Sequence, residues 1–82
     1  MSKRLLIIRD PGSRLLDYLN LDRDDQEIVL IQNAVYSERL RQKNASLLEE
    51  DVKARNIDTD GKTVDYDKLV DAIFSAQRVI CV

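Results

Sequence analysis

The sequence predicts an α/β protein with three layers, α/β/α, around a mainly parallel sheet of about five strands. Three short apolar runs, at 5–8, 28–31 and 79–82, are bounded by polar or charged residues. Continuous apolar runs of this kind are typical of parallel strands that are buried on both faces. Since helical patterns separate the runs, they should pair in parallel through right-handed crossovers. We expect them to lie side by side as the dry centre of the sheet.

The first half of the chain gives two strand–helix units. After strand 5–8, the segment Asp10-Pro11-Gly12-Ser13 breaks the chain, and its serine is a good N-cap for a short helix over 13–20. The polar segment 20–27 reads as a loop. A helix is predicted over 34–41 after strand 28–31, with Val35, Leu40 and Tyr36 turned inward.

The second half repeats the pattern with shorter elements. A weaker strand at 45–48 precedes a short helix over 50–55, and Asn56 follows where a left-handed residue is useful at a helix end. A turn-rich connection over 57–62, which includes Asp60-Gly61, leads to a very short strand at 63–64.

The last helix has the clearest apolar face. Asp65 can cap its N-terminus, and the face is formed by four residues at i, i+1, i+4 and i+5: Leu69, Val70, Ile73 and Phe74.

Length and composition predict one domain over residues 1–82 that needs support from other subunits. A chain of 82 residues buries only roughly 60–65% of its unfolded surface, so its core is thin. The single cysteine and the absence of histidine exclude an internal disulfide and argue against structural zinc. We therefore expect an oligomer and no cofactor or metal.

The charge balance excludes several classes of partner. The net charge is −2, whereas a dedicated nucleic-acid module is usually clearly basic, so no direct binding of nucleic acid is expected. No apolar run approaches the roughly 20 residues needed to span a bilayer. The basic-then-apolar N-terminus is too short for a signal peptide. We expect a cytoplasmic protein.

Ligands of open α/β sheets bind at the carboxyl ends of the strands. Here that rim is mostly acidic and holds Arg9, Asp10, Gln32, Asn33, Glu49, Glu50 and Asp65. Pro11-Gly12-Ser13 is a faint phosphate-loop pattern that a plain turn and cap also explains. The run 49–51 is either an acid–base pair or simply negative charge at a helix N-terminus.

Two further features have both a structural and a functional interpretation. Cys81 lies in an apolar run, as a buried structural cysteine does, yet it falls at the rim where Arg9 or Arg78 could activate a thiol. Arg39, Arg41 and Lys43 form either a solvated helix face or a small basic site for phosphates or an acidic partner.

Three segments, taken in order, resemble the DsrH/TusB family of sulfur-relay proteins. The run 28–36 is similar to the family's segment of a strand followed by an acid or amide, a small residue and an apolar one. The other two match the family's leucine–acid–"ARG" pattern and its "V-D-Y" segment, at the family's spacing: Leu48, Asp51, Ala54 and Arg55, then Val64-Asp65-Tyr66 with Leu69 and Val70. Together they align over 28–74 and cover about half of the chain.

The resemblance implies a DsrEFH-like fold and a role in relaying persulfide sulfur. TusB-like members join DsrE-like and DsrF-like sister subunits in a complex that serves 2-thiolation of the tRNA wobble uridine, and DsrH-like members serve sulfur oxidation. The carboxyl-end rim of the sheet and the matched segments together give the candidate rim or interface residues: Arg9, Asp10, Asn33, Tyr36, Asp51, Arg55 and Asp65.

The chain departs from the family pattern where the chemistry would be. Its expected first helix has no cysteine, Asn33-Ala34 stands where Asp-Gly is common, and Asn56 replaces a usual glycine. The favoured hypothesis is therefore a structural, non-catalytic subunit of a sulfur-relay complex, whose only thiol is buried. The alternatives are a sulfurtransferase with Cys81 as its catalytic residue, and a homo-oligomeric binding module unrelated to sulfur.

Overall fold

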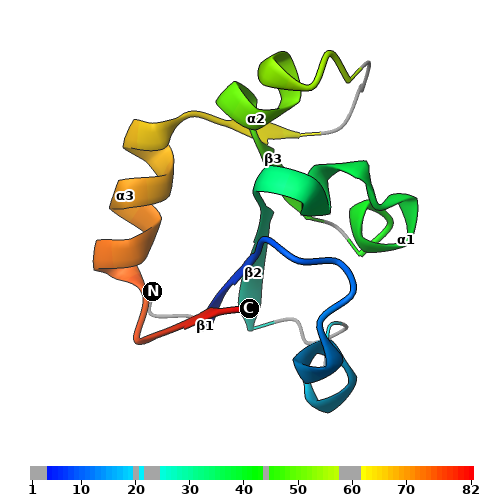
Figure 1. Cartoon of the computed structure of the whole chain (residues 1–82). Helices are drawn as coiled ribbons and strands as arrows, with labels where there is room; N and C mark the ends of the chain where they lie inside the picture. The colour runs from blue at the N-terminus through cyan, green and yellow to red at the C-terminus, as the bar shows by residue number, and fades with distance from the viewer. Residues whose placement is uncertain (1–3, 20, 22–24, 44, 58–61) are drawn as a thin grey trace.

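The computed structural model of the chain describes residues 4–19, 21, 25–43, 45–57 and 62–82. Five strands form one parallel sheet in the order β4-β3-β2-β1-β5. Helices lie against both of its faces, which confirms the three-layer α/β/α fold (Figure 1). The strands are β1 Arg4–Ile8, β2 Gln26–Leu30, β3 Ser46–Leu48, β4 Thr63–Val64 and β5 Arg78–Cys81; the helices are α1 Glu38–Arg41, α2 Glu49–Ala54 and α3 Tyr66–Ser75, with 3₁₀ helices η1 Arg14–Tyr18 and η2 Gln32–Tyr36.

The two central strands divide the core between the faces of the sheet. Side chains alternate along a strand, so in β1 Leu6 and Ile8 point to one face of the sheet while Leu5 and Ile7 point to the other. β2 alternates in the same way. The first face carries the larger cluster, which η1, η2, α1 and α2 cover. The second is covered by α3 through Leu69. All four residues of 5–8 are buried, as the sequence predicts.

The third apolar run is wrongly predicted to be part of the dry centre. β5 does pair with β1, so the three runs are adjacent, but β5 lies at the edge of the sheet. Val79 is 41% exposed and Cys81 is exposed, while Ile80 packs against the larger cluster. The cause is topological, because a strand with a neighbour on one side only leaves its flank open.

The apolar face of the last helix is also wider than the sheet can cover. Leu69 is buried, but Val70, Ile73 and Phe74 are 45%, 37% and 84% exposed. A helix touches a sheet along one stripe, and here the smaller Ala72 and Ala76 complete that stripe. Of the four residues that form the predicted apolar face, only Leu69 is therefore buried against the sheet.

Two predicted helices are shorter than expected. The helix predicted over 13–20 is the 3₁₀ helix η1. The helix predicted over 34–41 is divided into η2 and α1 at Ser37, which is extended and accepts the Leu40 N–H at its Oγ, 3.2 Å away. Val35 and Leu40 are buried as predicted, whereas Tyr36 is 55% exposed because the division turns it outward.

The end of α2 confirms the role predicted for Asn56. Its φ of 51° is left-handed. Its N–H donates to the Lys53 carbonyl at 3.2 Å, and the next amide, of Ile57, donates to the Val52 carbonyl at 3.0 Å. This pair of bonds is a complete Schellman motif. The predicted turn at Asp60-Gly61 lies outside the described residues, as do parts of the predicted loop over 20–27.

Candidate functional site

Backbone hydrogen bonds join the carboxyl ends of β1 and β5. The Val82 carbonyl accepts the N–H groups of Arg9 and Asp10 at 2.9 and 3.4 Å, and the Val82 N–H donates to the Ile7 carbonyl at 2.9 Å. The side chains of Arg9 and Asp10 are exposed at this junction. The structure thus places these two residues beside the strand that carries Cys81.

The turn after β1 is used for local structure. Asp10 Oδ1 accepts the Gly12 N–H at 2.9 Å, and Ser13 Oγ accepts the Leu15 N–H at 3.3 Å, as the N-cap of η1. Both side chains therefore satisfy backbone donors of their own turn. This arrangement agrees with the turn-and-cap interpretation of Pro11-Gly12-Ser13.

The segment after β2 separates buried from exposed residues. Ala34 and Val35 are fully buried in η2, while Asn33 and Tyr36 are exposed on its outer side. Ala34 and Val35, which match the small and the apolar residue of the family segment, therefore have a packing role. Asn33 and Tyr36 are free to contact a partner.

Asp51 connects this segment to α2. Its Oδ2 accepts the backbone N–H of Gln32 at 2.8 Å, and its Oδ1 pairs with Arg55 Nη1 at 3.1 Å. The two side chains are only 17% and 24% exposed. Gln32 has a left-handed φ of 51°, which for a residue other than glycine is an uncommon conformation. The two predicted interface residues Asp51 and Arg55 thus form a clasp with the chain after β2.

The role of Gln32 in this clasp is not visible in the sequence. The contact is made by its backbone amide, 19 residues from Asp51, so no residue type at position 32 signals it.

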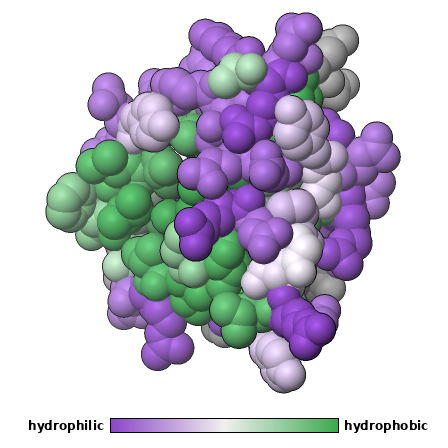
Figure 2. All heavy atoms as spheres, viewed as in Figure 1, coloured by the Kyte–Doolittle hydropathy of each residue, from purple (hydrophilic) through white to green (hydrophobic). Residues whose placement is uncertain are grey.

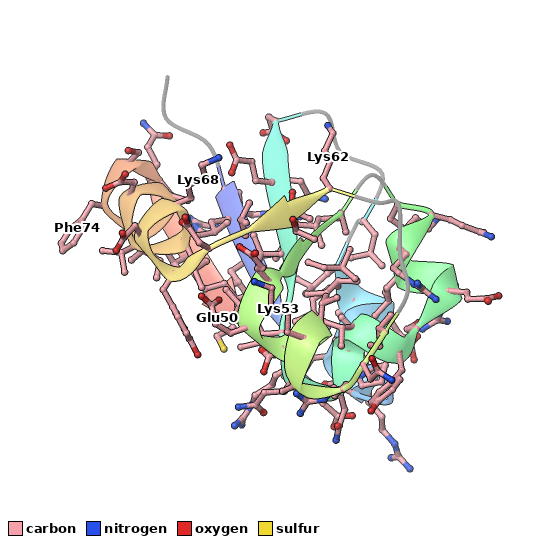
Figure 3. The ribbon with its side chains drawn as sticks, turned by 90° about the horizontal axis from the view of Figure 1, so that it is seen from above. Glu50, Lys53, Lys62, Lys68 and Phe74 are labelled. Carbon is pink, nitrogen blue, oxygen red and sulfur yellow. The ribbon has the colours of Figure 1, made fainter. Side chains whose placement is uncertain are left out.

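The remaining acids at the rim support helix ends. Asp65 is the N-cap of α3, and its Oδ1 accepts the Lys68 N–H at 2.8 Å, as predicted. Glu49 forms an ion pair with Lys53 at 2.9 Å on the surface of α2. The hydrogen bond and the charge of Glu49 raise the pKa of Lys53 above its ordinary value. Glu50, in the same first turn, is exposed (Figure 3).

Cys81 corrects the prediction of a buried thiol. It is a free cysteine and it is exposed. It lies opposite Ile7 in the register of the sheet, so its side chain is on the face that α3 covers. The apolar neighbours in the sequence do not bury it, because β5 is an edge strand. The thiol is therefore accessible, as the alternative hypothesis requires.

Five of the predicted site residues form two groups rather than one. Arg9, Asp10 and Cys81 lie at the joined ends of β1 and β5, and Asp51 and Arg55 lie at the end of β2. In the part of the chain that the structure describes, no group of three or more Cys, Asp or Glu side chains could hold a metal ion. In the same part, no helix is long and apolar enough to cross a membrane.

The predicted basic cluster has an acidic neighbour in α1. Arg41 lies 4.0 Å from Glu38, one helical turn away. Arg39 is exposed on the same helix. Arg39 therefore lies on a solvated helix face, whereas the Arg41 side chain is only 24% exposed and forms a weak ion pair with the exposed Glu38.

The chain was compared with known proteins at three levels. No protein-family model matches it. No curated protein matches it either. Among solved structures, the ychN protein from E. coli matches over 100% of both chains with a TM-score of 0.67 and 17% sequence identity. That likeness covers the full length of both chains, so the chain shares the fold of the ychN protein.

Proposed function

We propose that this chain is a structural subunit of a cytoplasmic sulfur-relay complex, in which DsrE-like and DsrF-like sister subunits carry the reactive cysteines. The proposal is supported by the resemblance of three segments to the DsrH/TusB family, by the fold shared with the ychN protein, and by one observation: the helix after β1, η1, contains no cysteine. The chain would contribute surface to the complex. The acceptor served would be the wobble uridine of tRNA or a step of sulfur oxidation.

The way in which the rim residues are used supports a structural role. Asp10, Asp51 and Asp65 each accept a backbone N–H from their own or a neighbouring element. A carboxylate held in this way stabilises the local backbone, which is a structural role. Asn33 and Tyr36 are left exposed on η2, where they would contact a sister subunit.

A second candidate function is favoured by the exposure of Cys81. In a sulfurtransferase, the Cys81 thiolate would attack the outer sulfur of a donor persulfide. A new S–S bond would form at Cys81 as the donor S–S bond breaks, and the donor cysteine would leave as a thiolate. The transfer needs no external oxidant, since the outer sulfur only changes its carrier.

One substitution separates the two candidates. Cys81→Ser removes the only thiol of the chain and keeps a side chain of similar size. The complex should be assembled with sister subunits and supplied with a radiolabelled persulfide donor. A structural subunit predicts that the substituted complex assembles and transfers sulfur at the normal rate. Loss of transfer from an intact complex would instead establish the sulfurtransferase.

A second measurement tests the thiol directly. A relay cysteine needs a substantial thiolate fraction near neutral pH. The rate of Cys81 alkylation should therefore be followed against pH in the native protein. A rate that rises only in the alkaline range of an ordinary thiol supports the structural role. A plateau reached below neutral pH supports sulfur carriage.

A further inference from the structure

Hydrophobic side chains gather on one side of the molecule, over α3 and β5 (Figure 2). On α3, four residues at i, i+4, i+7 and i+8 form a single exposed flank beside the stripe that packs on the sheet. We call this flank together with Val79 the apolar flank: Tyr66, Val70, Ile73, Phe74 and Val79, which are 55%, 45%, 37%, 84% and 41% exposed.

The apolar flank faces the open side of β5. The crossover from β4 through α3 to β5 is expected to be right-handed, which turns this flank of α3 past the last strand. Val79 pairs with Leu5 and therefore lies on the same face of the sheet as α3. Figure 3 shows Phe74 pointing away from the strands. An uncovered helix flank and an uncovered strand edge thus adjoin.

The backbone of β5 is open along this edge. Among the described residues β5 pairs with β1 only. Val82 directs both its N–H and its carbonyl at β1. Since this direction alternates along a strand, Val79 and Cys81 direct theirs outward. They offer two N–H groups and two carbonyls to another strand.

The two edges of the sheet are protected very differently. β4, at the other edge, has two residues and follows the exposed Lys62, which is a usual guard against strand pairing. β5 has four residues, Arg-Val-Ile-Cys, with neither lysine nor proline. Its one charged residue is Arg78 at its start, so the rest of this longer edge, Val79 to Cys81, is apolar.

We propose that a second copy of this chain occupies the edge of β5, so that two five-stranded sheets join into one. The two β5 strands would run antiparallel about a two-fold axis perpendicular to the sheet. Centred on Ile80, this pairing sets Val79 opposite Cys81 of the second copy. Val79 and Cys81 both direct their backbone N–H and carbonyl groups outward, so they can exchange hydrogen bonds with the second copy. Their side chains both lie on the α3 face of the sheet, so the two faces match across the joined sheets.

The same axis brings the two α3 helices together. A two-fold axis perpendicular to the sheet keeps α3 of each copy on the same face, and the two helices then meet antiparallel along their apolar flanks. No charged residue interrupts the flank. The chain's net charge of only −2 opposes self-association weakly.

The exposed area agrees with a stable dimer. With aromatic side chains of roughly 150–250 Å² each, the apolar flank exposes roughly 400–500 Å². A standard interface buries about 800 Å² per partner, of which about 57% is apolar. The apolar part of such an interface is close to what the flank supplies. The strand edge and its polar surroundings would supply the remainder.

Sedimentation equilibrium at about 1–100 μM protein tests the proposal against matched variants. Phe74→Asp has Tyr18→Asp as its control, since both rings are 84% exposed. Val79→Lys has Leu15→Lys, at an exposed leucine of η1. We expect a dimer whose dissociation constant rises at least about tenfold in the two flank variants, as for an interface anchor. The two controls should leave it unchanged.

Amide hydrogen exchange tests the strand pairing itself. The Val79 and Cys81 amides should become protected as the protein concentration rises, and Phe74→Asp should abolish that protection. A wild-type chain that stays monomeric at 100 μM overturns the proposal, even if a different protein binds the flank. So does a dimer in which these two amides exchange freely. Neither measurement depends on the chemistry of Cys81 or on sulfur transfer. The dimer and the proposed function are therefore tested separately, and the failure of one leaves the other unaffected.

Discussion

The carboxylate of Asp51 holds the backbone of Gln32 across 19 residues of sequence, with an N···O distance of 2.8 Å. The same carboxylate pairs with Arg55 at 3.1 Å. One side chain thus orients the chain after β2 against α2, and it holds Gln32 in a left-handed conformation. The clasp accounts structurally for two residues of the DsrH/TusB resemblance, Asp51 and Arg55.

Replacing Asp51 by alanine should destabilise the fold. The charge-assisted hydrogen bond to the Gln32 N–H and the ion pair with Arg55 would be lost, and the free energy of unfolding should fall by about 1.5 kcal/mol. Urea denaturation followed by circular dichroism measures the change. Glu50→Ala is the control, because this acid lies in the same helical turn but is exposed. Equal losses in the two variants would contradict the clasp.

Asn56 should tolerate glycine better than alanine. Its left-handed backbone is strained for a residue with a Cβ, so Asn56→Ala should lower the free energy of unfolding by about 1 kcal/mol. Asn56→Gly should be neutral or stabilising. Ala54→Gly, two residues earlier within α2, should have the opposite effect and lower the stability by about 0.5–1 kcal/mol. Thermal unfolding of the three variants distinguishes these signs.

The cap of α3 can be tested by loss and rescue. Asp65→Ala removes the acceptor of the Lys68 N–H and should cost about 1 kcal/mol of unfolding free energy. Asp65→Ser and Asp65→Asn retain an acceptor oxygen and should recover most of that loss. Chemical denaturation of all three variants is the measurement. Failure of both rescuing residues would show that Asp65 acts other than as a cap.

The Glu49–Lys53 pair predicts a dependence on pH in the alkaline range. The folded-state pKa of Lys53 is raised, first by its hydrogen bond to Glu49 and then by the charge of that residue. The pair therefore stabilises the fold at pH values below the pKa of Lys53 in the unfolded chain, roughly 10.4. That stabilisation is lost as the pH rises through the pKa of Lys53 in the folded protein. Glu49→Gln should lower the pKa of Lys53 in an NMR titration. Glu50→Gln should lower it less, since Glu50 is the weakest of the groups that raise it.

The centre of the sheet was predictable and its edge was not. The runs at 5–8 and 28–31 are apolar throughout because both of their faces are covered, and such continuity identifies a central strand. The run at 79–82 has the same composition, yet it forms an edge. Whether a fifth strand follows β1 or β4 is set by the crossover of α3, which leaves no local trace in the sequence. The exposure of Cys81 depends on that choice.

The site was predictable where a side chain acts on its own neighbourhood. Ser13, Asn56 and Asp65 act within a few residues of their positions, so turn and cap preferences identify them. The clasp between Gln32 and Asp51 joins two elements through a backbone group, and residue types carry no record of it. The exposure of one flank of α3 was not predictable, because helical periodicity marks an apolar side without saying what lies against it.

The pairing of Arg4 with Arg78 has a consequence for how the chain acquires its structure. β1 is the first strand of the sequence and β5 the last, so one side of β1 is paired only when the chain has continued 74 positions beyond Arg4. Contacts so distant in sequence require the closure of a large loop and form slowly. Until β5 has been synthesised, one edge of β1 is unpaired. A newly made chain therefore exposes a hydrophobic strand with free backbone hydrogen-bonding groups, to which other chains can bind.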